Sequence, residues 1–354
     1  MTQRILVREG EMANASDFLI GGNDEHGLNP PTVGKRTPVV PNLNREIYEN
    51  EFNRAAKEFF LLACLRVGFR IFDVKTEVQD VSIATRVARV NRAGLSALVT
   101  FAYNAYGDGK TFNSVNGYQV FYAPRGRMPQ ASRLLSYDVL AGLEKEVDNR
   151  SRGVGTLSGV GMLESVNCPA TLIEAGVMTN LEDVTRMLDP DYRRDVGEGA
   201  CQGVCQFLDV PYVSQTNITG LPTLRRGSRG NPVLYLQYLL RVNGYDTSPD
   251  GVFGANTERD VKKFQQDNGL TVDGIVGQNT WNALLTDRAP VIRKGSRGRW
   301  VRYAQQKLLS RFYNVGEADG IFGNATDREV RRFQEDNGLD VDGIIGPNTW
   351  RALR

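Results

Sequence analysis

The sequence predicts an α/β domain with a mostly parallel sheet, followed by two small three-helix domains. Over residues 15–211, short apolar runs typical of strands alternate with segments of helical periodicity, and this alternation indicates an α/β layered fold. From residue 222 onward, one set of glycine and Asp-Gly turn motifs occurs twice, which indicates a duplicated unit. The 354 residues are enough for two or three domains of ordinary size.

Within the α/β region, strands are expected at short apolar stretches and helices at longer segments with one apolar face. In chain order, the expected elements are a strand at 18–20, a helix at 51–67, a strand at 69–74, a helix at 81–92, a strand at 97–101, a strand at 117–122, a helix at 132–148, a strand at 170–174, and helices at 181–188 and 192–208. Residues 211–223 contain Ser-Gln-Thr-Asn-Ile-Thr-Gly and indicate a linker.

The duplicated unit is defined by five short motifs. These are Gly-Ser-Arg-Gly at 227–230 and 295–298, Asp-Gly-x-Phe-Gly at 250–254 and 319–323, Phe-Gln at 264–265 and 333–334, Val-Asp-Gly-Ile at 272–275 and 341–344, and Asn-Thr-Trp at 279–281 and 348–350. Apolar residues 233, 236, 239 and 240 fall at helical spacing. The Asp-Gly pairs indicate tight turns, and Asn256 or Thr257 is expected to cap the next helix.

The composition is that of an ordinary globular protein, with 41% hydrophobic and 24% charged residues. The 43 basic and 41 acidic side chains leave a net charge of +2, which gives no electrostatic reason to expect nucleic acid as the partner. No apolar run is long enough for a membrane helix, so we expect no membrane insertion. The four cysteines are expected to be buried thiols rather than a disulfide framework, because the N-terminus lacks the apolar core of a signal peptide.

Three polar residues fall near the predicted strand ends or in the flanking loops, where an α/β sheet usually forms its site. They are His26, Glu49 and Glu174. His26 lies in a loop, Glu49 stands just before the first predicted helix, and Glu174 closes the strand at 170–174.

The residues around these positions resemble the N-acetylmuramoyl-L-alanine amidase 3 family, in a branch found among clostridial and phage lysins. The family pattern is His-Gly-x-Asn with Gly-Lys-Arg-Ser-Pro, then Glu-x-x-Phe-Asn-Arg, an Asn-Ala strand end, and Cys-Pro-Ala-x-Leu-x-Glu. This chain matches it, with Thr37 in place of the serine. The resemblance implies zinc as the cofactor, His26 and Glu49 as zinc ligands, Glu174 as the catalytic carboxylate and Asn104 as a substrate-binding residue. Such a site would hydrolyse the amide between N-acetylmuramic acid and L-alanine, because zinc acidifies a bound water and a glutamate transfers its proton.

The chain departs from this family at Ala102. The family strand reads roughly Phe-Ile-Ser-Ile-His-x-Asn-Ala, and alanine stands here at the position of the histidine that binds zinc. His26 is the only histidine, and neither Tyr103 nor Asp108 is expected to replace an imidazole in place. A natural pseudoenzyme, or an active lysin inactivated by a deliberate His-to-Ala change, would produce this pattern. The intact neighbouring motifs favour a recent or deliberate change.

The duplicated unit resembles the peptidoglycan-binding domain 1 family, twice over, which implies peptidoglycan as the partner. Two weak modules in tandem bind a polymer through avidity. The expected domains are an N-terminal extension at 1–15, the amidase-like domain at 16–213, a linker at 214–221, and modules at 222–286 and 290–354. With no signal peptide visible, we expect synthesis in the cytoplasm and action at the bacterial cell wall after phage- or lysis-dependent release.

Three functions remain open from the sequence. The first is a lysin-type zinc amidase of the cell wall, with its activity reduced by Ala102. The second is a non-catalytic peptidoglycan-binding pseudoenzyme that uses all three domains for recognition. The third is a wall-binding component of a phage tail-like particle, which would need a large assembly interface.

Overall fold

The computed structural model describes residues 13–27, 35–215, 220–286 and 289–354. These residues form two compact units. The first lies within 1–40, 45–187 and 191–214, and the second within 41–44, 188–190 and 215–354. Most of the expected N-terminal extension at 1–15, half of the expected linker at 214–221, and two of the three residues between the modules lie outside the described residues.

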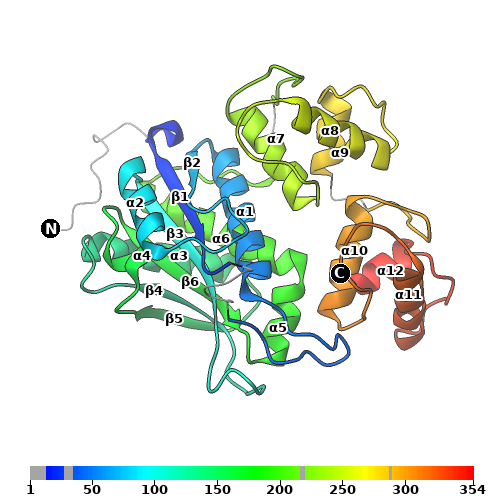
Figure 1. Ribbon diagram of the computed structural model, residues 1–354, viewed down its shortest axis with the longest axis horizontal. Coiled ribbons are helices and arrows are strands. Elements are labelled where there is room, and N and C mark those ends of the chain that lie inside the picture. Colours follow the sequence, from blue (N-terminus) through cyan, green and yellow to red (C-terminus); the bar gives the residue numbers. More distant parts are fainter. Residues whose placement is uncertain (1–12, 28–34, 216–219, 287–288) are drawn as a thin grey trace. The chain divides into compact units, whose positions relative to one another are not determined.

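The first unit is built on one six-stranded sheet with the strand order β2-β1-β3-β6-β4-β5 (Figure 1). Its strands are β1 (Leu19–Asp24), β2 (Arg70–Asp73), β3 (Ala97–Asn104), β4 (Tyr118–Tyr122), β5 (Ser151–Thr156) and β6 (Ala170–Val177). β1 pairs in parallel with β2 and β3, and β3 pairs in parallel with β6. β4 runs antiparallel to β6 and parallel to β5. The predicted mostly parallel sheet is confirmed.

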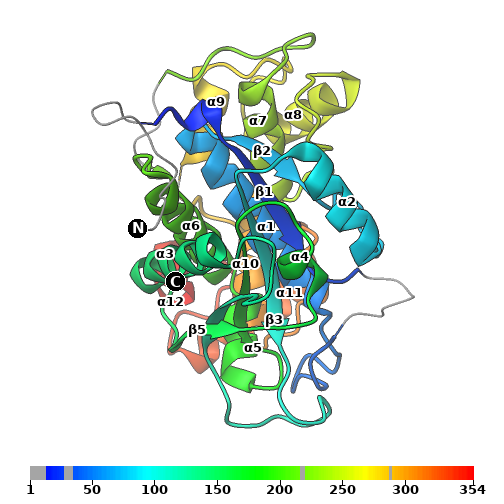
Figure 2. The same cartoon turned by 90° about the vertical axis from the view of Figure 1, so that its left-hand side faces the viewer.

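Helices cover both faces of the sheet. They are α1 (Glu49–Val67), α2 (Ile83–Ala93), α3 (Pro129–Glu146), α4 (Gly161–Glu164), α5 (Leu181–Leu188) and α6 (Pro190–Leu208). Figure 2 shows α2 and α4 on one side of the sheet and α3 and α6 on the other. The face of a strand residue follows from alternation along the strand. Phe101 packs its ring 5.4 Å from that of Phe60 on α1, so the odd-numbered residues of β3 face α1.

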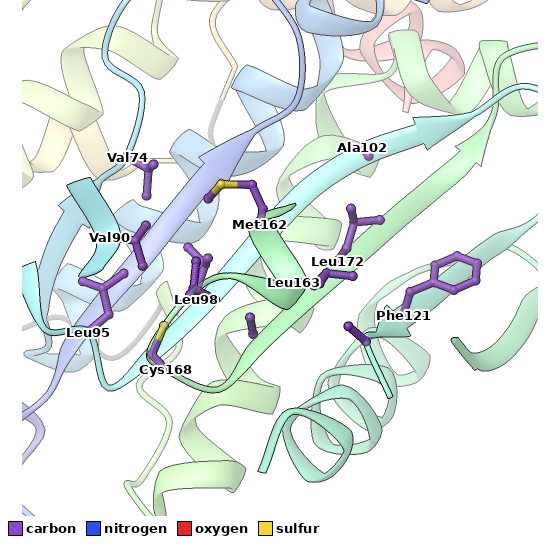
Figure 3. Close-up of a cluster of buried hydrophobic side chains, with 13 residues drawn as sticks. Val74, Val90, Leu95, Leu98, Ala102, Phe121, Met162, Leu163, Cys168 and Leu172 are labelled. Atoms are coloured by element: carbon purple, nitrogen blue, oxygen red, sulfur yellow. The ribbon is translucent and has the colours of Figure 1, made fainter. Parts of the chain in front are cut away.

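The even-numbered residues of β3 and β6 face α2 and α4, where they form a buried apolar cluster. Leu98 and Ala102 of β3, Leu172 of β6, Val90 of α2 and Met162 of α4 all belong to it. In Figure 3, Ala102 lies further along β3 than Leu98, toward the carboxyl end of the strand. Position 102 is therefore at the boundary between the apolar core and the edge of the sheet where a site is expected.

Three elements of this unit were not predicted, and the expected end of one strand was wrong. The structure adds the short 3-10 helix η1 (Ala15–Asp17), β5 and α4, which the sequence pattern did not indicate. β5 contains two glycines and no apolar alternation, and it forms as an edge strand through pairing with β4. The strand expected at 170–174 continues to Val177, so Glu174 lies inside β6 and does not close it. Pairing with both β3 and β4 carries β6 past Glu174.

The second unit contains two three-helix modules, as predicted. They consist of α7 (Asn231–Val242), α8 (Ala255–Asp267) and α9 (Gln278–Leu285), then α10 (Arg299–Ser310), α11 (Asn324–Asp336) and α12 (Pro347–Leu353). Each module closes through short backbone bridges, such as Leu224 with Val276 in the first and Ile292 with Ile345 in the second. The tryptophans of the Asn-Thr-Trp motifs, Trp281 and Trp350, are buried.

A buried glutamine organises every Asp-Gly turn of the modules. Gln237 donates from Nε2 to Asp250 Oδ1 at 2.7 Å and to Thr257 Oγ1 at 3.1 Å, and its Oε1 accepts from the amide of Gly251 at 2.8 Å. The same arrangement recurs at Gln265, Gln305 and Gln334. The expected capping role of Asn256 or Thr257 is wrong, because α8 begins at Ala255 and its N-cap residue is Gly254. Thr257 instead binds the glutamine.

The cysteine prediction is confirmed. Cys64, Cys168, Cys201 and Cys205 are all free and buried. The thiols of Cys64 on α1 and Cys201 on α6 lie 3.8 Å apart and pack as neighbours in the core. Among the helices that the structure describes, none is long and apolar enough to cross a membrane.

Candidate active site

The structure brings His26 and Glu49 together over the carboxyl end of β3. His26 follows β1 by two residues, and Glu49 is the first residue of α1. Their side chains meet with His26 Nε2 3.5 Å from Glu49 Oε2. The second oxygen of Glu49 accepts hydrogen bonds from the backbone amide of Tyr103 at 2.9 Å and from Asn53 Nδ2 at 3.0 Å. Glu49 is thus fixed next to the peptide bond that follows Ala102.

Glu174 lies beside Ala102 on the neighbouring strand. The two residues are direct partners in the parallel pairing of β3 and β6. Glu174 lies two residues after Leu172 on β6, so the two side chains are on the same face of the sheet. Leu172 and Ala102 belong to one cluster on that face, so Glu174 shares it with Ala102. The structure therefore gathers His26, Glu49, Ala102 and Glu174 in one place, although they come from four different segments of the chain.

Both carboxylates carry a buried oxygen that has no hydrogen-bond partner among the described residues, namely Glu49 Oε2 and Glu174 Oε2. Burial raises the pKa of Glu49 to about 7, against the opposing hydrogen bonds from Asn53 and Tyr103. Burial, and then the charge of Glu49, raise the pKa of Glu174 to about 8. Burial also lowers the pKa of His26, so its ring favours the neutral form that can bind a metal. Perturbed groups with unpaired buried atoms are typical of a functional site.

The backbone at His26 is held in a strained conformation. Its φ of 57° lies in the left-handed region, which costs energy for a residue with a side chain. Asn50 Nδ2 donates to the carbonyl oxygen of His26 at 2.9 Å and stabilises this turn. At Gly27, a Cβ atom would lie 2.2 Å from the backbone nitrogen of Asp80, so only glycine fits there. The local fold thus fixes the direction of the histidine.

A buried ionic network lies next to the turn at His26 and stabilises it. Asp24 accepts from Lys57 Nζ at 2.6 Å, from Lys75 Nζ at 2.9 Å and from Asn50 Nδ2 at 2.8 Å, and Lys57 also donates to Asp73 at 2.7 Å. Burial alone would raise the pKa of Asp24, but the two ammonium groups outweigh it and hold the pKa below its usual range. Asn50 links this network to the carbonyl of the histidine.

Replacing Asp24 by Asn is expected to lower the free energy of unfolding by about 3–5 kcal/mol, because it leaves two buried ammonium groups without their shared carboxylate. Urea unfolding at pH 7 of both proteins measures the difference. The exposed Asp17→Asn is the control and should change stability by less than about 0.5 kcal/mol. Since the pKa of Asp24 is lowered, its stabilisation is present above its unfolded pKa near 3.8 and is lost only in stronger acid. An Asp24→Asn protein as stable as the parent would show that the network is dispensable.

A catalytic zinc usually takes three protein ligands and leaves one position open. Two atoms bound to one zinc with tetrahedral geometry lie about 3.3 Å apart. His26 Nε2 and Glu49 Oε2, at 3.5 Å, have the spacing of two such ligands, and a buried carboxylate oxygen without a hydrogen-bond donor is suited to bind a cation. Ala102 supplies no donor atom, and within the described ranges no group of three His, Cys, Asp or Glu side chains is arranged to hold a metal ion. The residues present therefore form two thirds of a zinc site, not a complete one.

The other two residues considered as replacements lie elsewhere. Tyr103 points to the opposite face of the sheet, where its ring packs 5.5 Å from that of Phe52. Asp108 is exposed in the loop after β3. Asn104 ends β3, and its carbonyl accepts from the amide of Met178 at 2.7 Å, which fixes the corner of the strand. The substrate-binding role of Asn104 stays a prediction.

Sequence reasoning missed several residues of this site. Glu25, Lys35 and Arg152 all act electrostatically on Glu174, and they come from the loops around β1 and α1 and from the unpredicted strand β5. Asn53 was recognisable, because it stands one helical turn after Glu49 in the Glu-x-x-Phe-Asn motif and so lies on the same face of α1. No local signal points to Arg152.

Comparisons with known proteins show the families to which the parts of the chain belong. The family described as N-acetylmuramoyl-L-alanine amidase matches residues 26–206, just over half of the chain. A second family, described as a putative peptidoglycan binding domain, matches residues 229–284 and 297–353. The chain belongs to the N-acetylmuramoyl-L-alanine amidase family and carries two peptidoglycan-binding domains at its C-terminus. This family is generally zinc-dependent.

Individual relatives share parts of the chain. N-acetylmuramoyl-L-alanine amidase CwlM of Mycobacterium tuberculosis is 36% identical over 113 residues, which are 29% of this chain and 27% of that protein. A probable N-acetylmuramoyl-L-alanine amidase of Bacillus licheniformis is 30% identical over 161 residues, covering 38% of this chain and 46% of the relative. The chain thus spans about a quarter to a half of the length of these curated relatives. An N-acetylmuramoyl-L-alanine amidase structure from Clostridium difficile 630 is similar to 54% of this chain and 97% of its own, with 24% identity and a TM-score of 0.46.

Proposed function

We propose that this chain is a peptidoglycan-directed amidase of the lysin type, which acts at the bacterial cell wall on the amide between N-acetylmuramic acid and L-alanine. The observation that carries the proposal is the convergence of His26, Glu49 and Glu174 beside Ala102, with a buried Oε2 atom on each glutamate that makes no hydrogen bond to a described residue. Membership in the amidase family supports the choice of bond.

Glu174 is the residue that we assign to proton transfer. Cleavage of an amide requires a group that takes a proton from the attacking water and gives one to the departing amine. A pKa of about 8 places Glu174 close to neutral pH, where it can exchange a proton in either direction. Its buried Oε2 makes no hydrogen bond with a described residue, so no internal partner holds the proton at this atom.

Ala102 favours a second function for the chain as it stands, namely peptidoglycan binding without efficient turnover. A metal held by His26 and Glu49 alone would lack the third protein ligand that fixes its geometry. The C-terminal modules contain none of these residues, so their affinity for the wall is independent of this loss. Both functions share one substrate and differ only in the rate of the chemical step.

Residues 222–354 are expected to bind purified sacculi without the amidase-like unit, because both modules are complete and separately folded around their own helices. Cosedimentation with sacculi measures this binding, and circular dichroism confirms that the fragment is folded. Residues 222–286 alone should bind at least about tenfold more weakly, since the second attachment is intramolecular in the pair. A charge-matched helical protein is the control, and no enrichment over it would contradict the prediction.

The bond is tested by digesting sacculi with the Ala102→His chain. An amidase releases stem peptides that begin with a free L-alanine and leaves the glycan strands uncut. Mass spectrometry of the soluble fraction identifies the new amino terminus. The appearance of new sugar ends, or of peptides cut elsewhere, would overturn the proposed bond.

A further inference from the structure

A cavity of about 470 Å³ opens beside the candidate active site in the first unit. It is bounded by the segment at 35–39, which precedes α1, and by the loop after β3. One hydrogen bond and one chain connection place the cavity next to the site. The backbone amide of Glu49 donates to the carbonyl of Lys35 at 2.9 Å, and Ala105, which lines the cavity, directly follows the last residue of β3. A volume of this size is typical of a pocket that holds a small ligand or one part of a larger one.

The wall of this cavity carries more positive than negative charge. Its wall carries Lys35, Arg36 and Lys110 against Glu46 and Asp108. The guanidinium of Arg36 pairs with Glu46 at 3.2 Å, and Asp108 Oδ1 accepts from the backbone amide of Lys110 at 2.9 Å. Within the described part of the chain, neither the Lys35 nor the Lys110 ammonium group forms an ion pair. Two exposed cations therefore remain available to an incoming anion.

Lys35 also connects the cavity to the candidate active site. Its carbonyl oxygen accepts from the backbone amide of Glu49, so Lys35 lies next to the segment that carries this carboxylate. A ligand group bound at Lys35 would therefore lie next to the segment that carries Glu49. The stem peptide begins at the nitrogen of the scissile amide. It is therefore the part of the substrate that fits this position.

We propose that this basic cavity binds a free carboxylate of the stem peptide, on the glutamate that follows L-alanine, and thereby selects stem peptides in which this carboxylate is not amidated. The proposal rests on the proposed function, because it assumes that the substrate is a muramoyl peptide. Lys35 and Lys110 approach the cavity from two different loops and would hold the carboxylate between them. Peptide amidation replaces the anion by a neutral amide and removes the ionic attraction while leaving the shape nearly unchanged.

The test compares two muramoyl dipeptides in which the γ-carboxylate of the glutamate is capped as a methylamide, namely N-acetylmuramoyl-L-alanyl-D-glutamate with a free α-carboxylate and the same compound with that group amidated. Binding to the full chain with Ala102 is measured by calorimetric titration at low salt, since binding does not require turnover. We expect the acid to bind about tenfold more tightly than the amide. Lys35→Gln and Lys110→Gln should each reduce this ratio by about two- to fivefold, and the double variant should bring it close to one. Raising the salt to about 1 M should also reduce the ratio, because exposed charges are screened.

The ratio is used because any effect of a lysine on the site carboxylates acts on both ligands equally. Lys145→Gln, which removes an exposed lysine on α3, is the matched control and should leave the ratio unchanged. A ratio near one in the parent chain, or one that the double variant does not alter, would overturn the inference. Equal competition by inorganic phosphate and by the acid would also overturn it, since it would assign the cavity to phosphate in general.

The same ligands separate this inference from the proposed function. In the Ala102→His chain, cleavage of both dipeptides with equal kcat/KM would retain the amidase function and overturn the subsite. Cleavage of neither dipeptide, together with no release of peptide from sacculi, would remove the proposed function and this inference with it. Preferential cleavage of the acid that disappears in the double lysine variant would support both.

Discussion

Replacing Ala102 by His is expected to raise amidase turnover by at least about 100-fold, with one zinc ion retained per chain. Loss of a residue that only supports a metal ligand already costs about 10–100-fold in activity or affinity, and a missing ligand should cost more. The new imidazole would project from β3 beside Glu174 and next to Glu49, whose Oε1 accepts from the amide of Tyr103 and whose Oε2 lies 3.5 Å from His26 Nε2. It would complete the three-ligand set that catalytic zinc uses.

Dye release from labelled peptidoglycan measures the turnover, and elemental analysis of the dialysed protein measures the zinc. Ala102→Leu is the control for volume, because position 102 is buried and a larger side chain there strains the packing against the apolar cluster. Ala102→His with His26→Ala should lose the gained activity and the metal. Equal activity in the parent and Ala102→His chains, at equal zinc content, would show that the parent holds its metal in another way.

Replacing Glu174 by Gln in the Ala102→His background is expected to reduce turnover by about 10²–10⁴-fold, the range typical of a lost acid–base group. Glutamine keeps the size and one carbonyl oxygen but cannot exchange a proton. Because Glu174 Oε2 has no hydrogen-bond partner among the described residues, the replacement breaks no internal bond at that atom. Turnover should therefore fall without loss of the fold.

The stability of the metal-free parent chain gives a second readout that a structural role would not produce. The pKa of Glu174 is about 8 when folded and 4.5 at its ordinary value, so the folded state binds the proton more tightly. Its contribution to stability is fully present below pH 4.5 and is lost as the pH rises to about 8. Glutamine does not titrate, so Glu174→Gln should raise the Tm at pH 8.5 by at least about 2–4 °C, the shift that ~1 kcal/mol gives a domain of this size.

Thermal unfolding of the parent and Glu174→Gln chains at pH 4.5 and pH 8.5 checks this expectation, and the two Tm values should coincide at the lower pH. Glu164→Gln, on the short helix α4, is the control for the loss of a carboxylate elsewhere in the same unit. A lower Tm for Glu174→Gln at both pH values would move Glu174 to the residues that hold the fold, and retained turnover would remove it from proton transfer.

The family, the two C-terminal modules and the absence of a donor at Ala102 could all be predicted from the amino-acid sequence. These features are readable because they depend on residue types at fixed spacing along the chain, such as the glycines and aspartates of the repeated turns. The long helices α1 and α6 were also predictable, because each carries an apolar face over many turns. The predicted residues His26, Glu49 and Glu174 lie together in the structure.

The surroundings of those residues, in contrast, depend on the tertiary structure. Strand β5 has no apolar pattern of its own and forms by pairing with β4, and with it Arg152 comes within electrostatic reach of Glu174. The position of Glu174 inside β6 follows from pairing with strands on both sides. The burial of Glu49 and Glu174, the lack of hydrogen-bond donors at their Oε2 atoms, and the contact of Lys35 with Glu49 all depend on distances between segments that lie far apart in sequence. Such distances are set by packing, and local pattern carries no information about them.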